Sequence, residues 1–195
     1  MKKHTKRAIA VLLIFCIALL SGFLVDLIWT RIERRSYSTD YDEIITRYSG
    51  EYNVPKSVIY AVIKTESDFD PNAESSAGAL GLMQMIPSTF EWLTGEEHLD
   101  ENLSSRKLFD PEVSIRYGTY YLAYLYRKFD YNWRNAFAAY NGGEGNVAKW
   151  LKNPEYSDGN GNLTHIPFKE TRAYVSKVEE AKEEYEKLYP TLPNS

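Results

Sequence analysis

A glutamate continues the apolar face of a predicted helix in the first half of the chain. Proline is tolerated in the first turn of a helix, so we expect a helix to begin at Pro55. Val58, Val62 and Glu66 are spaced four apart and share one face of it. Desolvation on an inward face and the negative end of the helix dipole both raise the pKa of a carboxyl group. A general acid needs such a shift, so Glu66 is the candidate catalytic acid and base.

Position alone leaves a plainer interpretation of Glu66 open. It could be a partly exposed residue at a helix end, paired with Lys64 or an arginine. Asp68 faces elsewhere, and Asp70 precedes Pro71 in a turn. No second carboxylate is obvious for a retaining or inverting glycosidase, which indicates that the substrate itself takes part in the reaction.

The sequence predicts neither a metal site nor a cofactor. His4, His98 and His165 are dispersed, and Ser67 has no histidine in a recognisable catalytic arrangement. Residues 158–162 resemble the start of a calcium loop, but the glycine and the bidentate glutamate of such a loop are missing. We interpret that segment as a turn.

Basic residues followed by a long apolar run mark the N-terminus. The apolar run extends from residue 8 to about residue 25 and continues to Trp29, which is long enough for a membrane span. We expect residues 1–29 to form a cytoplasmic stub and an uncleaved transmembrane anchor. Positive charge before the run predicts a single-pass protein of the cell membrane, with a cytoplasmic N-terminus and the domain outside. The alternative is a cleaved signal and a secreted domain.

The remainder predicts one helical domain. We expect a polar stalk over residues 30–41, a catalytic domain over 42–190 and a short tail over 191–195. One helical pattern begins at Tyr41 and is interrupted near Gly50. A second begins at Pro55 and ends by Pro71. Others cover residues 87–93, 110–129, 132–142 and 168–189, and no strand-length alternation is present. The net charge of −4 and the lack of a basic cluster after residue 40 exclude a nucleic-acid partner.

Four sequence blocks in order resemble the catalytic domain of soluble-lytic-transglycosylase type, which is related to goose-type lysozyme. The blocks are residues 57–69, 71–87, 139–143 and 166–175, which include Glu66-Ser67, Gly81-Leu82-Met83-Gln84, Ala139-Tyr140-Asn141 and Glu170-Thr171-Arg172-Ala173-Tyr174. One block alone is weak, but four with sensible spacing are specific. The resemblance implies a compact, lysozyme-like fold of the all-α class, also described as α+β, after the N-terminal transmembrane helix.

The resemblance also implies an activity and a set of site residues. It implies a peptidoglycan lytic transglycosylase, a carbon–oxygen lyase that cleaves the β-1,4 bond between N-acetylmuramic acid and N-acetylglucosamine without water. Glycan strands are then the expected partner, and 1,6-anhydromuramic ends the expected product. Glu66 is the implied acid and base. The implied substrate-binding residues are Ser67, which orients the N-acetyl group; Gly81, which lets the backbone approach the sugar; Met83 and Gln84, which line the cleft; Tyr140, which hydrogen-bonds Glu66; Asn141; Tyr174; and Glu170, near the stem peptide.

Two other functions remain open on the same fold. A lysozyme-type hydrolase would release reducing ends instead of anhydro ends. A wall-binding module without catalysis would keep the fold and bind the sacculus.

Overall fold

The computed structural model describes residues 3–95, 99 and 101–190. The chain divides into two compact units, Met1–Ser38 and Thr39–Ser195, each of which is considered by itself. The predicted tail at 191–195 and the histidine at position 98 lie outside the described residues. The predicted limits of anchor, stalk, domain and tail stay predictions.

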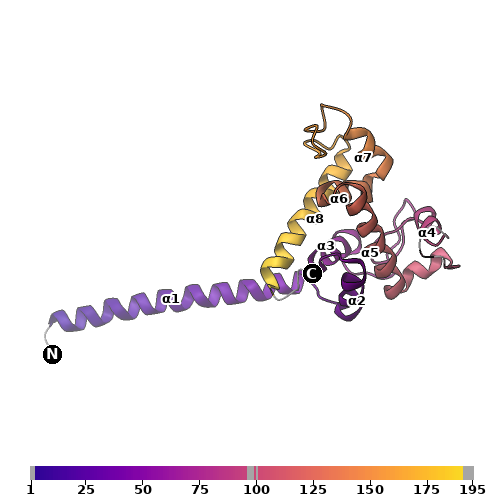
Figure 1. Cartoon of the computed structure of the whole chain (residues 1–195). Helices are drawn as coiled ribbons and strands as arrows, with labels where there is room; N and C mark the ends of the chain where they lie inside the picture. The colour runs from indigo at the N-terminus through magenta and orange to yellow at the C-terminus, as the bar shows by residue number, and fades with distance from the viewer. Residues whose placement is uncertain (1–2, 96–98, 100, 191–195) are drawn as a thin grey trace. The chain divides into compact units, whose positions relative to one another are not determined.

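The first unit is built on one helix, α1 (Lys3–Ser36) (Figure 1). Large apolar side chains along it, among them Phe15, Leu19, Phe23 and Trp29, are exposed. Within the described residues, one segment, Phe15–Ser36, is long and apolar enough to cross a membrane. The helix continues past residue 30, so the predicted boundary between anchor and stalk lies inside α1.

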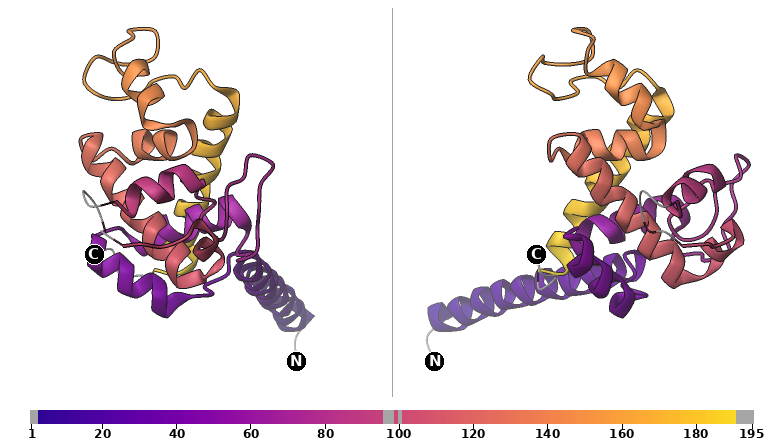
Figure 2. Two further views of the ribbon diagram at one scale, coloured as in Figure 1. Left: turned by 90° about the vertical axis from the view of Figure 1, so that its right-hand side faces the viewer. Right: turned by 45° about the vertical axis from the view of Figure 1, so that its right-hand side comes forward.

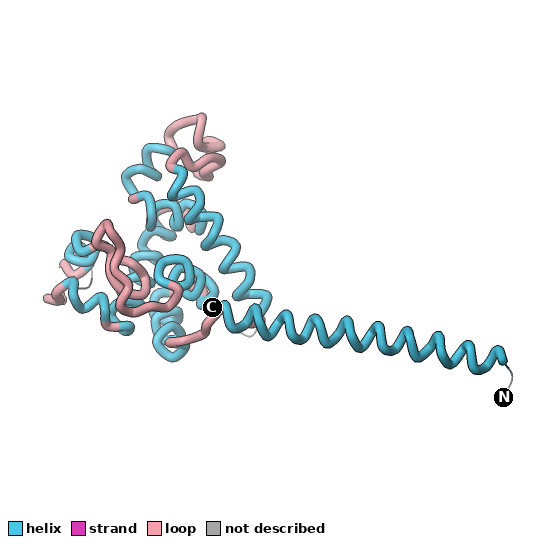
Figure 3. Tube along the Cα trace, turned by 180° about the vertical axis from the view of Figure 1, so that it is seen from behind, coloured by secondary structure: helices cyan, strands magenta, loops and turns pink. Residues whose placement is uncertain are grey.

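The second unit is helical, as the sequence predicts. Its elements are α2 (Asp42–Tyr52), α3 (Lys56–Ser67), α4 (Pro87–Leu93), the short 3₁₀ helix η1 (Ser105–Phe109), α5 (Pro111–Lys128), α6 (Trp133–Gly142), α7 (Glu144–Trp150) and α8 (Lys169–Leu188). Only isolated β-bridges occur among the described residues, so the prediction of an all-α class is confirmed. Figure 3 shows long loops between α3 and α4 and between α7 and α8.

Helix α3 is the centre of this unit. It packs against α8 and α2, while α6 packs against α5, α7 and α8 (Figure 2). Val58, Ile59, Val62 and Ile63 are fully buried. Burial on nearly every side fixes the direction of α3, because each buried aliphatic side chain contributes about 1.5–3 kcal/mol. The C-terminal turn of α3, which carries Glu66, is therefore held rigidly.

Most helix starts follow their sequence signals. Proline is the first residue of α4. The side chain of Asp110 accepts a hydrogen bond from the Glu112 amide at the start of α5 (3.0 Å), and Asn132 accepts one from the Asn135 amide at the start of α6 (3.1 Å). Side-chain oxygens at these positions satisfy amides that have no partner inside the helix.

One expectation about helix limits is wrong, one limit lies earlier than the proline that bounds it, and one helix was not predicted. Gly50 does not interrupt α2, because it lies on an exposed face where nothing packs within 4 Å of a Cβ position. Helix α3 ends at Ser67, before Pro71, because Asp68 takes the left-handed conformation (φ 51°) and its amide bonds to the Lys64 carbonyl. Helix α7, which was not predicted, begins directly after the turn at Gly143 (φ 84°).

Candidate active site

Glu66 lines a cleft of about 370 Å³ in the helical unit. Its lining residues come from the last turn of α3, the loop before α4, α4 itself, α5, the end of α6 with the turn after it, and the first turn of α8. The side chains and glycines that line it are Glu66, Ser75, Ser76, Ala77, Ala79, Gln84, Met85, Ile86, Thr89, Tyr121, Tyr140, Asn141, Gly143 and Glu170. Segments far apart in the sequence thus meet around one carboxyl group.

The environment of Glu66 favours a neutral carboxyl group. Burial raises its pKa from 4.5 to about 7, and the hydroxyl of Tyr174 opposes part of that rise. Lys64 forms an ion pair with Asp68 at 2.5 Å on the outer face of the helix. The open interpretation that Glu66 pairs with Lys64 therefore finds no support in the contacts. A carboxyl with a pKa near 7 can give and take a proton at neutral pH.

Two tyrosines flank Glu66 and differ in their hydrogen bonds. The Tyr140 hydroxyl donates to the Met83 carbonyl at 2.8 Å, so the expected bond to Glu66 is replaced by one to the loop. The Tyr174 hydroxyl is buried and makes no hydrogen bond of normal geometry to the described residues, yet it lies close enough to influence Glu66. Burial and the nearby Glu66 raise the pKa of both phenols, so both stay neutral.

The loop that walls the cleft is tied down by its own polar groups. The Ser67 hydroxyl donates to the Leu82 carbonyl at 2.8 Å, which joins the end of α3 to the loop. The side-chain amide of Gln84 donates to the carbonyls of Ala73 (3.0 Å) and Gly81 (2.9 Å). Gln84 has a positive φ of 47°, a conformation that costs energy for a residue with a Cβ. These bonds offset that cost, and the amide oxygen of Gln84 remains available to a ligand.

Two expected cleft residues lie behind the wall instead. The Met83 side chain is fully buried against Gly118 of α5, where a Cβ would come within 2.3 Å of its sulfur. Gly81 has a positive φ of 73°, and a Cβ there would meet the Leu108 carbonyl oxygen at 1.9 Å. Neither residue lines the cleft. Both position the loop, which differs from the substrate contact expected of them.

Asn141 and Glu170 are exposed and line the cleft, as expected of ligand-binding residues. Glu170 is in the first turn of α8, more than 100 residues from Glu66 in the sequence. It places a second carboxylate in the same cleft, which the carboxylates close to Glu66 in the sequence, Asp68 and Asp70, do not do. The signal was the fourth motif block, since it carries Glu170 together with Tyr174.

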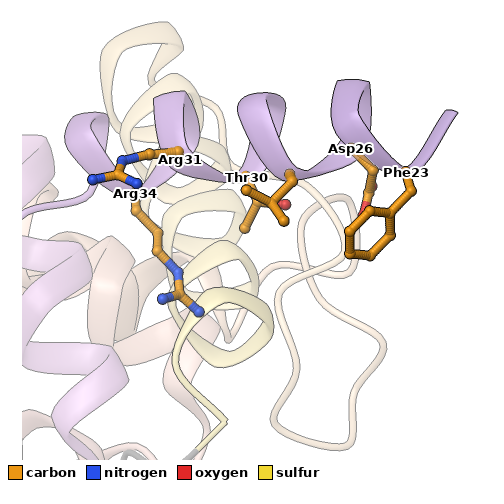
Figure 4. Close-up of a pocket in the computed structure, with 6 residues that line it drawn as sticks. Phe23, Asp26, Thr30, Arg31 and Arg34 are labelled. Atoms are coloured by element: carbon orange, nitrogen blue, oxygen red, sulfur yellow. The ribbon is translucent and has the colours of Figure 1, made fainter. Parts of the chain in front are cut away.

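No group of three or more His, Cys, Asp or Glu side chains that could hold a metal ion is found in the described part of the chain. The segment at 158–162 forms a turn, in which the carboxylate of Asp158 accepts hydrogen bonds from the Asn160 and Asn162 amides. A separate depression on α1 shares no residue with the cleft (Figure 4). Residues of this one helix line it: Phe23, Asp26, Leu27, Thr30, Arg31 and Arg34.

Comparison with known proteins agrees with this geometry. Residues 43–162 match the family described as Transglycosylase SLT domain. The chain belongs to this family. The matched range holds Glu66, the cleft loop and Tyr140, whereas the start of α8 lies beyond it.

Relatives in the SLT family include soluble and membrane-bound proteins. The chain is 36% identical over 152 residues to the soluble lytic murein transglycosylase of Escherichia coli (strain K12), which covers 77% of this chain and 23% of that protein. It is 31% identical over 181 residues to the membrane-bound lytic murein transglycosylase C of Salmonella typhi, and the matched region covers 83% of this chain and 50% of that protein. The chain thus spans about a quarter of the soluble relative and half of the membrane-bound one.

Solved structures of the SLT family share the fold. The 70 kDa soluble lytic transglycosylase of Escherichia coli superposes with a TM-score of 0.74 at 34% identity, over 83% of this chain and 26% of that chain. A complex of the 70 kDa soluble lytic transglycosylase with bulgecin A gives a TM-score of 0.73 at 34% identity, over 83% and 27%. The predicted lysozyme-like fold is confirmed. A relative named as membrane-bound and the apolar α1 together point to membrane association.

Proposed function

We propose that the chain is a peptidoglycan lytic transglycosylase. It cleaves the β-1,4 bond between N-acetylmuramic acid and N-acetylglucosamine and leaves 1,6-anhydromuramic ends. One observation carries this proposal: the desolvated Glu66, with a pKa of about 7, sits in the cleft of a chain from the SLT family. Proteins of that name act on peptidoglycan, and the site has the acid that their chemistry needs.

In the proposed reaction, neutral Glu66 gives its proton to the glycosidic oxygen as the C1–O bond breaks. The N-acetyl group of the muramic residue stabilises positive charge at C1. Ionised Glu66 then takes the proton of the C6 hydroxyl while its oxygen bonds to C1. The carboxyl returns to its neutral form, so no water is consumed and no second carboxylate is required.

The neighbouring residues have supporting roles in this proposal. The buried Tyr174 hydroxyl has no partner of normal geometry among the described residues, so it is available to donate to Glu66 when the carboxyl ionises. Tyr140 and Gln84 form the wall against which the sugar lies. Asn141 and Glu170 contact parts of the substrate at the cleft edge. Ser67, Gly81 and Met83 act through the loop that they hold.

Mass spectrometry of digested peptidoglycan tests the proposal. The full-length chain in detergent should release muropeptides with anhydro ends, and Glu66→Gln should release none. Glu180→Gln, on the exposed face of α8, is the matched control and should digest at the wild-type rate. Products about 18 Da heavier, with reducing ends, would establish a hydrolase instead. Sacculus binding without cleavage by the wild type would establish a wall-binding module.

We propose further that α1 is an uncleaved single-pass anchor that leaves the domain outside the cytoplasm. The basic residues that precede the apolar run support this orientation. Full-length chain should stay in membranes that are washed with high salt, and protease added to intact protoplasts should remove the domain. A shortened chain in the medium would support the cleaved signal and contradict the anchor.

A further inference from the structure

The cleft around Glu66 continues into two side cavities. One, of about 350 Å³, shares Thr89, Tyr121 and Gly143 with the central cleft. The other, of about 410 Å³, shares Asn141 and Glu170 with it. The two side cavities have no lining residue in common. They therefore leave the central cleft at two different places, and the three form one groove with Glu66 in its middle part.

Exposed apolar side chains of the helical unit gather along this groove. Four large ones are exposed among its described residues: Ile86 (43%), Trp92 (41%), Tyr131 (68%) and Phe168 (49%). Ile86 lines the central cleft, Trp92 one side cavity and Phe168 the other. Only Tyr131 lies elsewhere. Exposed apolar surface that is concentrated in a groove marks a binding site.

Neighbouring rings hold both end aromatics in fixed orientations. Trp92 meets Tyr124 edge-on, with ring centres 5.2 Å apart and planes at 74°, and Tyr121 at 6.3 Å and 81°. Phe168 meets Trp150 edge-on at 4.9 Å and 80°. A ring that is already oriented loses little entropy when a ligand binds. The C–H groups on the face of a pyranose ring match the negative face of an aromatic ring.

We infer that the groove binds sugars on both sides of the bond that is cut, with Trp92 and Phe168 as positioning residues, and that cleavage is endolytic. The inference rests on the proposed function. Binding energy from remote sugars accelerates the reaction when it is realised in the transition state. A bond in the interior of a strand has enough sugars on each side to fill both arms of the groove, whereas a bond near a strand end leaves one arm only partly filled, so interior bonds react faster.

The lengths of the glycan strands test this inference. Long, uncross-linked glycan strands are incubated with the full-length chain in detergent, and strand length and free disaccharide units are followed from the earliest times. We expect the mean strand length to fall before disaccharide units accumulate. Trp92→Ala and Phe168→Ala should each lower kcat/KM on long strands about tenfold, since each removes one stacking contact. Both should have a much smaller effect on a substrate too short to fill both arms.

Three further variants separate binding from folding. Trp92→Phe and Phe168→Tyr keep an aromatic ring and should restore most of the loss, whereas Tyr131→Ala, outside the groove, should match the wild type. Disaccharide release from the first time point, with the remaining strands at full length, would overturn the inference. So would equal behaviour of Trp92→Ala, Phe168→Ala and Tyr131→Ala. Absence of anhydro ends altogether would refute the proposed function, whereas anhydro ends with terminal release would refute only endolytic cleavage.

Discussion

Replacing Glu66 by glutamine should make the protein more stable at alkaline pH. The pKa of Glu66 is about 7 in the folded chain and 4.5 when unperturbed. Between these values the folded state binds more protons than the unfolded state, so the stability of the wild type falls as pH rises through that window. Glutamine has nearly the same shape and cannot ionise, so the variant should not share this fall.

The size of the effect follows from the pKa difference. Each unit corresponds to about 1.4 kcal/mol, which gives about 3 kcal/mol for the interval from 4.5 to about 7. Water in the cleft reaches part of the carboxyl and screens its charge, so this figure is an upper bound. At pH 4.5 the folded forms of both proteins are neutral at this position, and their stabilities should be nearly equal. At pH 8 the free energy of unfolding of the variant should exceed that of the wild type by about 2–3 kcal/mol.

Urea unfolding of the full-length chain in detergent, followed by tryptophan fluorescence, measures the difference. Both proteins are unfolded in urea at pH 4.5, 5.5, 6.5, 7.5 and 8.5, which serve as the chosen test points. Their free energies of unfolding are compared with one common slope of free energy against urea concentration. The measurement at pH 4.5 is the internal control for the substitution itself. Parallel stability curves across the series would refute the claim that burial raises the pKa of Glu66.

Further predictions concern activity and stability around the same cleft. The rate of cleavage should decline above about pH 7 as Glu66 ionises. In Tyr174→Phe this decline in the pH–rate profile should move to higher pH, because the hydroxyl that lowers the pKa of Glu66 is gone. Gly81→Ala should lower the melting temperature by several degrees and cost about 3 kcal/mol, because its Cβ would lie 1.9 Å from the Leu108 carbonyl oxygen. Glu170→Gln should keep more than about a tenth of the wild-type kcat, and loss of all cleavage would indicate a mechanism with two carboxylates.

Local signals in the sequence predicted the frame of the site. The apolar stripe that ends in Glu66 predicted a buried carboxyl at the end of a helix, because helix periodicity alone places it there. The caps at Asp110 and Asn132 also depend on neighbouring residues only, and they lie at the first residues of two predicted helical segments. The helix after Gly143 escaped prediction because its 7 residues are too few for a clear apolar period and it lacks the initial proline that marks the equally short α4.

Contacts between distant segments could not be predicted in the same way. The fit of Met83 against Gly118 depends on how the loop meets α5, which no local pattern records. The same packing places the Met83 carbonyl where the Tyr140 hydroxyl donates to it. Glu170 joins the cleft only because α8 packs against α6, although helix α7 and the loop after it separate these two helices in the sequence.

The hydrogen bonds of the cleft loop indicate that the motif residues have different roles in the proposed reaction, since some hold the loop and Glu66 transfers the proton. Ser67, Gln84 and Tyr140 each donate to a backbone carbonyl, so their donors hold the loop in a strained conformation that includes the positive φ of Gln84. Rigid walls leave the cleft shape unchanged when the substrate arrives, which lowers the cost of reorganisation in the transition state. Proton transfer then depends on Glu66, whose pKa stays raised only while these walls limit its contact with water. Weakening a loop bond should therefore lower the pKa of Glu66 toward 4.5 and reduce activity together, although the altered side chain never touches the reacting atoms.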